Sequence, residues 1–263
     1  MTSTTDLGVF PFGQKVSAVT QVDRSPKSIF VLGVYASAVH ARWLGEDGGT
    51  KINALAVASE PEIFWRGNDA ELIVEQIHIP EGAGRLRATS ARLNGPSGRS
   101  LDNQFLSPLG LSRADAWLCD LYPFAHMNPR QKKAIEREYA PLAEAFRLPV
   151  PSLLPAPTKG PGLQRAEEIW REFSTSQAET MVLLGDKPVD WFLHLLDFPY
   201  RRLSEFGETD QAYGRLHQVE IRGRRLNILP LVHPRQASRL GASSQKWAAL
   251  HKEWIQSVAP RLL

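Results

Sequence analysis

The sequence predicts an α/β fold, a three-layer α/β/α arrangement around a central four-stranded, mostly parallel sheet. Short continuous apolar runs, typical of strands buried on both faces, recur along the chain. Segments of helical period separate these runs, as crossover helices do. The chain has 263 residues and is 43% hydrophobic, which is enough for one sizeable core. We therefore expect a single domain over 28–263 after an irregular lead-in at 1–27.

Four apolar runs are the expected strands of this sheet. They lie at 28–35, 115–122, 179–185 and in the second half of a hairpin over 216–231. A further strand is expected at 51–59, where Pro61 follows its end. The pattern at 71–79 fits a strand or a helix, and the Gly-, Arg- and Ser-rich stretch 81–98 is expected to be a loop.

Helices are expected between and after these strands. Asn128 and Pro129 are suited to the N-cap and the first position of the helix expected over 128–146. The proline-rich segment 149–161 is expected to be an extended linker or surface loop. The expected helices lie at 101–109, 128–146, 164–173, 188–196 and 236–257.

Composition limits the partners and cofactors. The net charge is +3 and the sequence pI is about 9.1, which permits nucleic-acid binding. Cys119 is the only cysteine, so neither an internal disulfide nor a cysteine-ligated metal cluster is expected. We expect no cofactor.

The N-terminus is polar, and no apolar run is long enough to span a membrane. A cytoplasmic protein without a membrane partner is therefore expected. Arginines gather at 85, 87, 92 and 99, and again at 201–202, 222, 224–225, 235 and 239.

The strand ends define where a site would lie. Ligands of open parallel sheets bind outside the carboxyl ends of the strands. The expected site therefore draws on residues 33–40, 120–124, 185–188 and 233–236.

Two of these stretches resemble a known family. Residues 94–120 read N-G-P-S-G-R-S-L-D-N-Q-F-L-S-P-L-G-L-S-R-A-D-A-W-L-C-D, and 227–236 contain I-L-P-L-V-H-P-R-Q. The first is similar to the helix start and following strand of the iron–sulfur branch of the uracil-DNA glycosylases. The second is similar to the last strand of that superfamily, which ends in H-P-S. The order of these stretches and of the expected strands, over about 28–256, resembles that of a divergent member of the superfamily. The four cluster cysteines of the iron–sulfur branch are absent.

The resemblance implies roles for two residues. His233 matches the family histidine that stabilises the departing base, and a neutral imidazole can donate to a base oxygen. Asp120 stands where the family usually has the Asn that reads uracil. An ionised Asp only accepts hydrogen bonds, so it favours a ring with an exocyclic amino group. Alternatively, Asp120 is protonated in a dry pocket, or it acts as the general base itself.

The loop after the first strand departs from the family. The family carries a carboxylate that orients or activates water there, whereas this chain reads G-V-Y-A-S-A from Gly33. Val34 cannot activate water, so Tyr35 is the expected catalytic side chain, and Ser37 and His40 the other polar candidates. A helix is expected to begin just after His40. Glu60 and Glu62 are alternatives for the missing carboxylate, with a solvated loop as the favoured interpretation of both.

The remaining expected contacts come from other loops. Leu93 falls where the iron–sulfur branch has the aromatic that stacks on the base, and Gly185 ends the third strand of the sheet. After His233-Pro234, the resemblance implies a segment that enters the duplex. Arg235 and Arg239 suit phosphate contacts there, and Leu240 suits a wedge.

We therefore predict a divergent DNA glycosylase, a monomer that hydrolyses the N-glycosidic bond of a flipped uracil or other damaged base in DNA without a metal or cofactor. The alternative is a catalytically degenerate module of the same fold that binds nucleic acid or a nucleotide. A third hypothesis is a hydrolase that acts on a small molecule in the same cleft.

Overall fold

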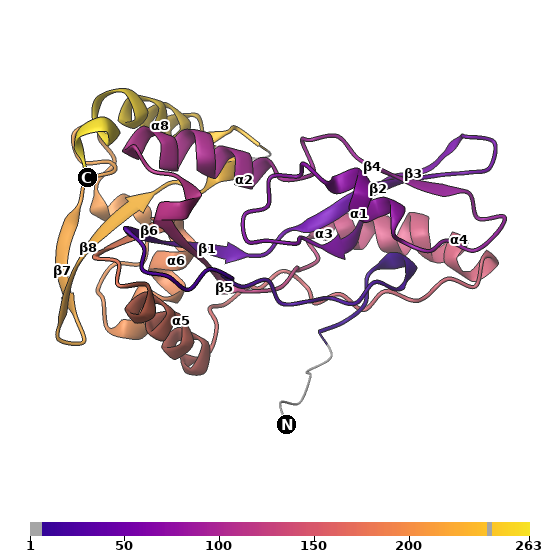
Figure 1. The fold of residues 1–263 in the computed structure, drawn as a ribbon, viewed down its shortest axis with the longest axis horizontal. Helices are drawn as coiled ribbons and strands as arrows, with labels where there is room; N and C mark the ends of the chain where they lie inside the picture. The colour runs from indigo at the N-terminus through magenta and orange to yellow at the C-terminus, as the bar shows by residue number, and fades with distance from the viewer. Residues whose placement is uncertain (1–6, 241–243) are drawn as a thin grey trace. The chain divides into compact units, whose positions relative to one another are not determined.

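The computed structural model describes residues 7–240 and 244–263. The chain divides into two compact units, each made of three segments (Figure 1). Unit 1 contains the segment up to Val19 together with Tyr35–Pro96 and Pro123–Pro157. Unit 2 contains Thr20–Val34, Ser97–Tyr122 and Thr158–Leu263. The stretch 28–263, expected as one domain, thus passes twice from unit 2 into unit 1 and back.

Unit 2 is built on a five-stranded sheet with the order β5-β1-β6-β8-β7. β6 pairs in parallel with both β1 and β8, and β7 runs antiparallel to β8. The mostly parallel α/β sheet is confirmed. It has one strand more than expected because both arms of the C-terminal hairpin join it. The strands are β1 (Ile29–Tyr35), β5 (Ala116–Tyr122), β6 (Thr180–Leu184), β7 (His217–Ile221) and β8 (Arg224–Leu231).

Helices cover both faces of this sheet. Figure 1 shows α2 and α8 on one side and α5 and α6 on the other, which gives unit 2 three layers. β6 is buried at every position, which is why it is continuously apolar rather than alternating. The helices are α2 (Pro96–Leu101), α5 (Leu163–Ser176), α6 (Asp186–Trp191), α7 (Pro234–Ala237) and α8 (Gln245–Ser257).

The strand order places a switch point in the sheet. The chain passes from β1 outward to β5 on one side, and then back across β1 to β6 and β8 on the other. In open α/β sheets ligands bind at such a switch point, outside the carboxyl ends of the two strands between the opposite crossovers, here β1 and β6. Gly33 and Val34 near the end of β1, and Gly185 just past β6, lie at these ends.

Unit 1 contains a second, three-stranded antiparallel sheet with the order β3-β2-β4. Trp43 is fully buried at its centre, with Tyr139 and Phe12 packed against the indole. α1 and the helical stretch from α3 to α4 contribute to the same core. The elements are β2 (Ala38–Leu44), β3 (Thr50–Ser59), β4 (Arg85–Ala88), α1 (Ala70–Glu75), α3 (Pro129–Ala134), the π-helical turn η5 (Ile135–Tyr139) and α4 (Ala140–Ala145).

Two expectations for unit 1 were wrong. β2 occupies the position where a helix was expected to begin after His40, and β4 lies inside the stretch expected to be a loop. β2 buries Val39, Ala41 and Trp43 and exposes Arg42 between the last two, which is the two-residue period of a half-buried strand. The tertiary packing of Trp43 selects this conformation.

Other expectations are confirmed with small shifts. Asn128 is the N-cap of α3, and its side chain accepts from the backbone N–H groups of Arg130 and Gln131 at 3.0 Å. The segment 71–79 contains a helix, α1. The helix expected over 236–257 is instead two helices, α7 and α8. Arg239, two residues after the end of α7, has φ +54°, which cannot continue a right-handed helix.

Candidate functional site

The predicted site residues divide between the two units. Gly33, Val34, Asp120, Gly185, His233, Arg235, Arg239 and Leu240 belong to unit 2, and Tyr35, Ser37, His40 and Leu93 belong to unit 1. The structure describes each set within its own unit.

His233 follows β8 and is the N-cap of α7. Its Nδ1 accepts a hydrogen bond from the backbone N–H of Arg235 at 3.2 Å. A neutral imidazole that accepts at Nδ1 carries its proton on Nε2. Burial, together with the charges of Arg235 and Lys187, lowers the pKa of His233 to about 4. His233 is therefore neutral at pH 7 and presents an Nε2–H donor.

A chain of hydrogen bonds fixes the backbone that leads into His233. The backbone N–H of Val232 donates to the hydroxyl of Tyr213 at 3.0 Å, and this hydroxyl donates to Nδ1 of His251 at 2.8 Å. Nε2 of His251 in turn donates to the carbonyl of Gln104 at 3.0 Å. His251 is only 1% exposed, and burial lowers its pKa to about 4. Burial thus favours the neutral form of His251, which these hydrogen bonds require.

Gly185 lies directly against His233. Its N–H donates to the carbonyl of Leu231 at 2.7 Å, which joins the end of β6 to the end of β8. Its φ is +91°, and a Cβ at this position would lie 3.3 Å from Cβ of His233. Ser100 secures the other side of the histidine, because its hydroxyl donates to the carbonyl of Pro234 at 3.2 Å. The structure thus brings together the third-strand glycine and the histidine.

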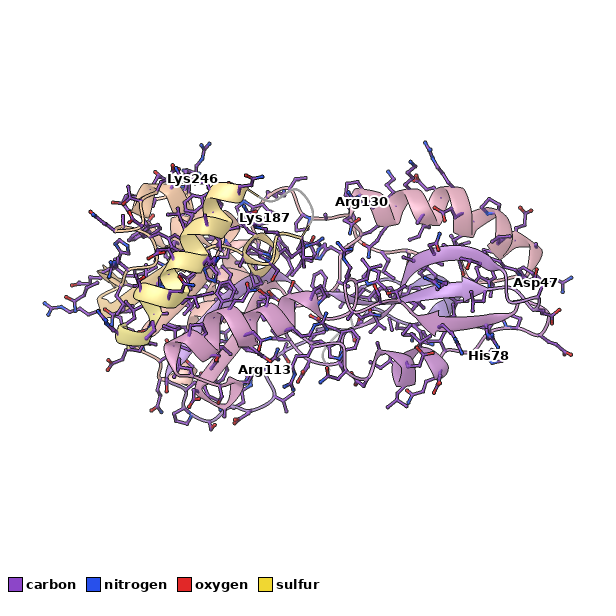
Figure 2. All side chains as sticks on the ribbon, turned by 90° about the horizontal axis from the view of Figure 1, so that it is seen from above. Asp47, His78, Arg113, Arg130, Lys187 and Lys246 are labelled. Carbon is purple, nitrogen blue, oxygen red and sulfur yellow. The ribbon has the colours of Figure 1, made fainter. Side chains whose placement is uncertain are left out.

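Lys187 was missed by the sequence interpretation. This lysine, labelled in Figure 2, lies in the first turn of α6. Its ammonium sits 4.6 Å from the ring centroid of Trp191, and its charge reaches His233. Burial lowers the pKa of Lys187 itself. The sequence did hold a signal for it, because Lys187 comes two residues after Gly185, which ends a strand. From that position a lysine can meet an anion at the carboxyl edge of the sheet.

Asp120 lies within β5 and is 4% exposed. Burial raises the pKa of its carboxyl to about 7, against the opposing effect of the Arg165 guanidinium. Arg165 donates to the backbone carbonyl of Asp120 at 2.8 Å. Among the described residues none donates a hydrogen bond to the Asp120 carboxylate. Near pH 7 the side chain is therefore partly protonated, and in that form it both donates and accepts, as an Asn does.

The loop after β1 is connected to a carboxylate from elsewhere in unit 1. Ser37 is exposed, and its backbone N–H donates to Oε1 of Glu60 at 2.9 Å. Glu60 follows β3 and is 4% exposed, so the expectation of a solvated Glu60 was wrong. Glu62 is exposed as expected. The antiparallel return of β3 along β2 is what brings Glu60 back to this loop.

The other residues of this loop have structural partners. Val34 is 8% exposed within β1, so it is a core residue in unit 2. The ring of Tyr35 lies 5.4 Å from that of His126. His40 is in β2, where its backbone N–H donates to Asn94 at 2.8 Å and its Nε2 lies 2.9 Å from the amide nitrogen of Gln131.

The residues expected to contact DNA lie in α7 and in the segment that follows it. Arg235 and Arg239 are exposed, and Leu240 is half-buried. The backbone N–H of Leu240 donates to the carbonyl of Arg235 at 2.8 Å, which brings the three side chains into one short turn. Leu93, in unit 1, is 44% exposed.

Comparison with known proteins found no match that assigns a role to these residues. The sequence matches no protein-family model, and no curated protein matches it either. Over residues 7–240 and 244–263, no group of three His, Cys, Asp or Glu side chains is arranged to hold a metal ion. Nor does any helix in these ranges have the length and apolar character needed to span a membrane.

Proposed function

We propose that this chain is a divergent DNA glycosylase that hydrolyses the N-glycosidic bond of a flipped uracil or other damaged base. The observation that carries the proposal is His233, a neutral imidazole with its Nε2–H available, at the carboxyl end of the sheet. A flipped base bound at the carboxyl end of β6, beside Gly185, would meet this donor.

The chemistry needs a donor of this kind. When the C1′–N bond breaks, the bonding electrons leave with the base and its exocyclic oxygen gains negative charge, while water adds to C1′ and the proton that it loses neutralises the departing base. A positioned neutral donor stabilises that charge, and such donors typically contribute about 100-fold to 1,000-fold in rate. The nearby Lys187 favours an anion in the same place.

Asp120 belongs to the same unit as His233. In the proposed reaction its partly protonated carboxyl reads the base edge by donating and accepting hydrogen bonds.

Base release from labelled oligonucleotides tests the proposal. The substrates are oligonucleotides carrying uracil, hypoxanthine, xanthine, or mismatched thymine or cytosine. We expect His233→Ala to lower single-turnover release by about 100-fold or more, and the double variant Asp120→Ala, His233→Ala to abolish it. Absence of release from every substrate by the unmodified protein would refute catalysis. Salt-dependent DNA binding without release would then identify the degenerate binding module.

A further inference from the structure

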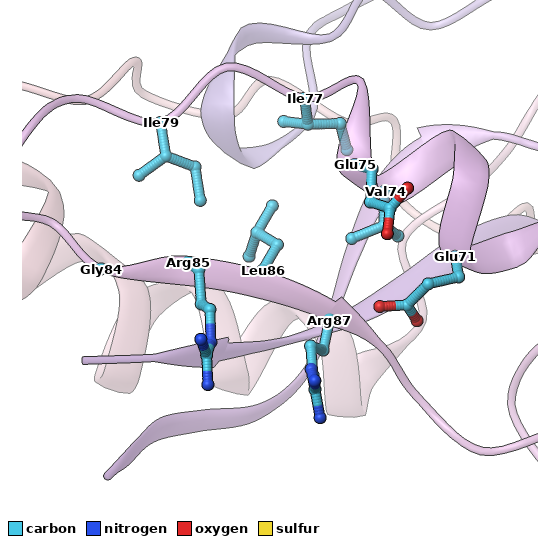
Figure 3. Close-up of a pocket in the computed structure, with 9 residues that line it drawn as sticks. All are labelled: Glu71, Val74, Glu75, Ile77, Ile79, Gly84, Arg85, Leu86 and Arg87. Atoms are coloured by element: carbon cyan, nitrogen blue, oxygen red, sulfur yellow. The ribbon is translucent and has the colours of Figure 1, made fainter. Parts of the chain in front are cut away.

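One face of the antiparallel sheet in unit 1 carries three exposed arginines, Arg42, Arg85 and Arg87, which we call the arginine stripe. Arg42 of β2 pairs directly with Arg87 of β4. Arg85 precedes Arg87 by two residues, so both side chains leave β4 on the same face. Figure 3 shows Arg85 and Arg87 leaving the strand on one side and Leu86 on the opposite side, toward Val74, Ile77 and Ile79.

The arginine stripe has no acidic partner among the described residues. β2, β3 and β4 contain no Asp or Glu, and no ion pair within 4.0 Å involves the stripe, whereas Arg113, Arg165 and Arg222 of unit 2 are each paired with a carboxylate.

Two acids of α1 share a groove with the arginine stripe. Glu71 and Glu75 line this groove of about 390 Å³ together with Arg85 and Arg87 (Figure 3). Glu71 accepts the backbone N–H of Ala88 at 3.0 Å. Its carboxylate is therefore held at the end of β4 and not on either arginine.

This arrangement costs stability in the isolated protein. Like charges directly opposite each other on neighbouring strands are destabilising. A neutralising anion would remove that cost. The guanidinium fork matches phosphate oxygens with two parallel hydrogen bonds. Side chains two residues apart on a strand are about 7 Å apart, so the stripe can engage several phosphates of one extended strand.

We infer that the arginine stripe binds the sugar–phosphate backbone of DNA and adds a second, sequence-independent contact surface to the protein. The inference rests on the proposed function for the choice of DNA as the anion. Contacts of this kind carry affinity but no base information, because phosphates are the same at every step. The stripe would therefore hold DNA without selecting the base.

The salt dependence of binding tests the inference. The triple variant Arg42→Gln, Arg85→Gln, Arg87→Gln is titrated against a labelled single-stranded oligonucleotide at several salt concentrations. Three lost phosphate contacts should reduce the slope of log K against log salt by about 2 and weaken binding most at low salt. The matched control is Arg130→Gln, Lys133→Gln, Arg137→Gln, which removes the same charge from exposed positions on α3 and η5.

An unchanged slope in the stripe variant, or an equal fall in the control, would overturn the inference. Thermal unfolding accompanies each titration, and the stripe variant should be as stable as the unmodified protein or slightly more so, because a repulsive pair is lost. Base release is measured separately at saturating protein. A reduced slope supports the inference even if no base is ever released, whereas release with an unchanged slope supports only the proposed function.

Discussion

Asp120→Asn is expected to stabilise the protein at pH 8 and to leave its stability at pH 4 almost unchanged. The carboxyl has a pKa of about 7 in the folded protein, against an ordinary value of 3.8, because β5 buries it. The folded state therefore holds this proton more tightly than the unfolded chain. The contribution of Asp120 to the free energy of unfolding is therefore most favourable below about pH 4. It falls as the pH rises toward 7 and is constant above that. The pKa difference corresponds to about 4 kcal/mol at most.

Urea unfolding of both proteins between pH 4 and pH 8 measures this effect. Titration of His233 and His251 lowers stability in acid in both proteins alike, so the difference between the two curves isolates Asp120. The control is Asp210→Asn, at an exposed position, for which we expect no pH-dependent gain. A gain of the same size at pH 4 and pH 8 would mean that burial does not raise the pKa of Asp120.

Unit 2 could be predicted from the sequence because its strands are buried on both faces. β1 and β6 are continuous apolar runs and β5 is apolar around Asp120, and such runs stand out whatever surrounds them. Gly185 follows β6 and His233 follows β8, so the rule for the carboxyl ends of strands placed them at one edge of the sheet. Their direct contact depends on the pairing of β6 with β8.

Unit 1 was harder to predict because its sheet is small and half exposed. β4 is only four residues long, and two of them are arginines, which is a weak strand signal taken alone. The position of Glu60 could not be predicted, since it depends on β3 pairing with β2 in antiparallel register. The bond between Tyr213 and His251 joins residues 38 positions apart, and no local pattern marks it.

Tyr213→Phe is expected to destabilise unit 2 by about 2–3 kcal/mol. The change removes one hydroxyl and leaves two buried groups without partners, the N–H of Val232 and Nδ1 of His251, each of which costs about 1–3 kcal/mol. The matched control is Tyr200→Phe, since no hydrogen bond of the Tyr200 hydroxyl is found among the described residues. We expect that control to change the free energy of unfolding by less than about 0.5 kcal/mol.

The same variant separates positioning of His233 from binding of DNA. Val232 immediately precedes His233, so loss of its anchor lets the imidazole shift, and a shift of about 1 Å can cost about 100-fold in rate. Base release below the unfolding temperature should therefore fall in Tyr213→Phe while the salt slope of DNA binding stays that of the unmodified protein. If release is retained despite the lower stability, the hydrogen-bond chain through His251 supports the fold of unit 2 and not the geometry of His233.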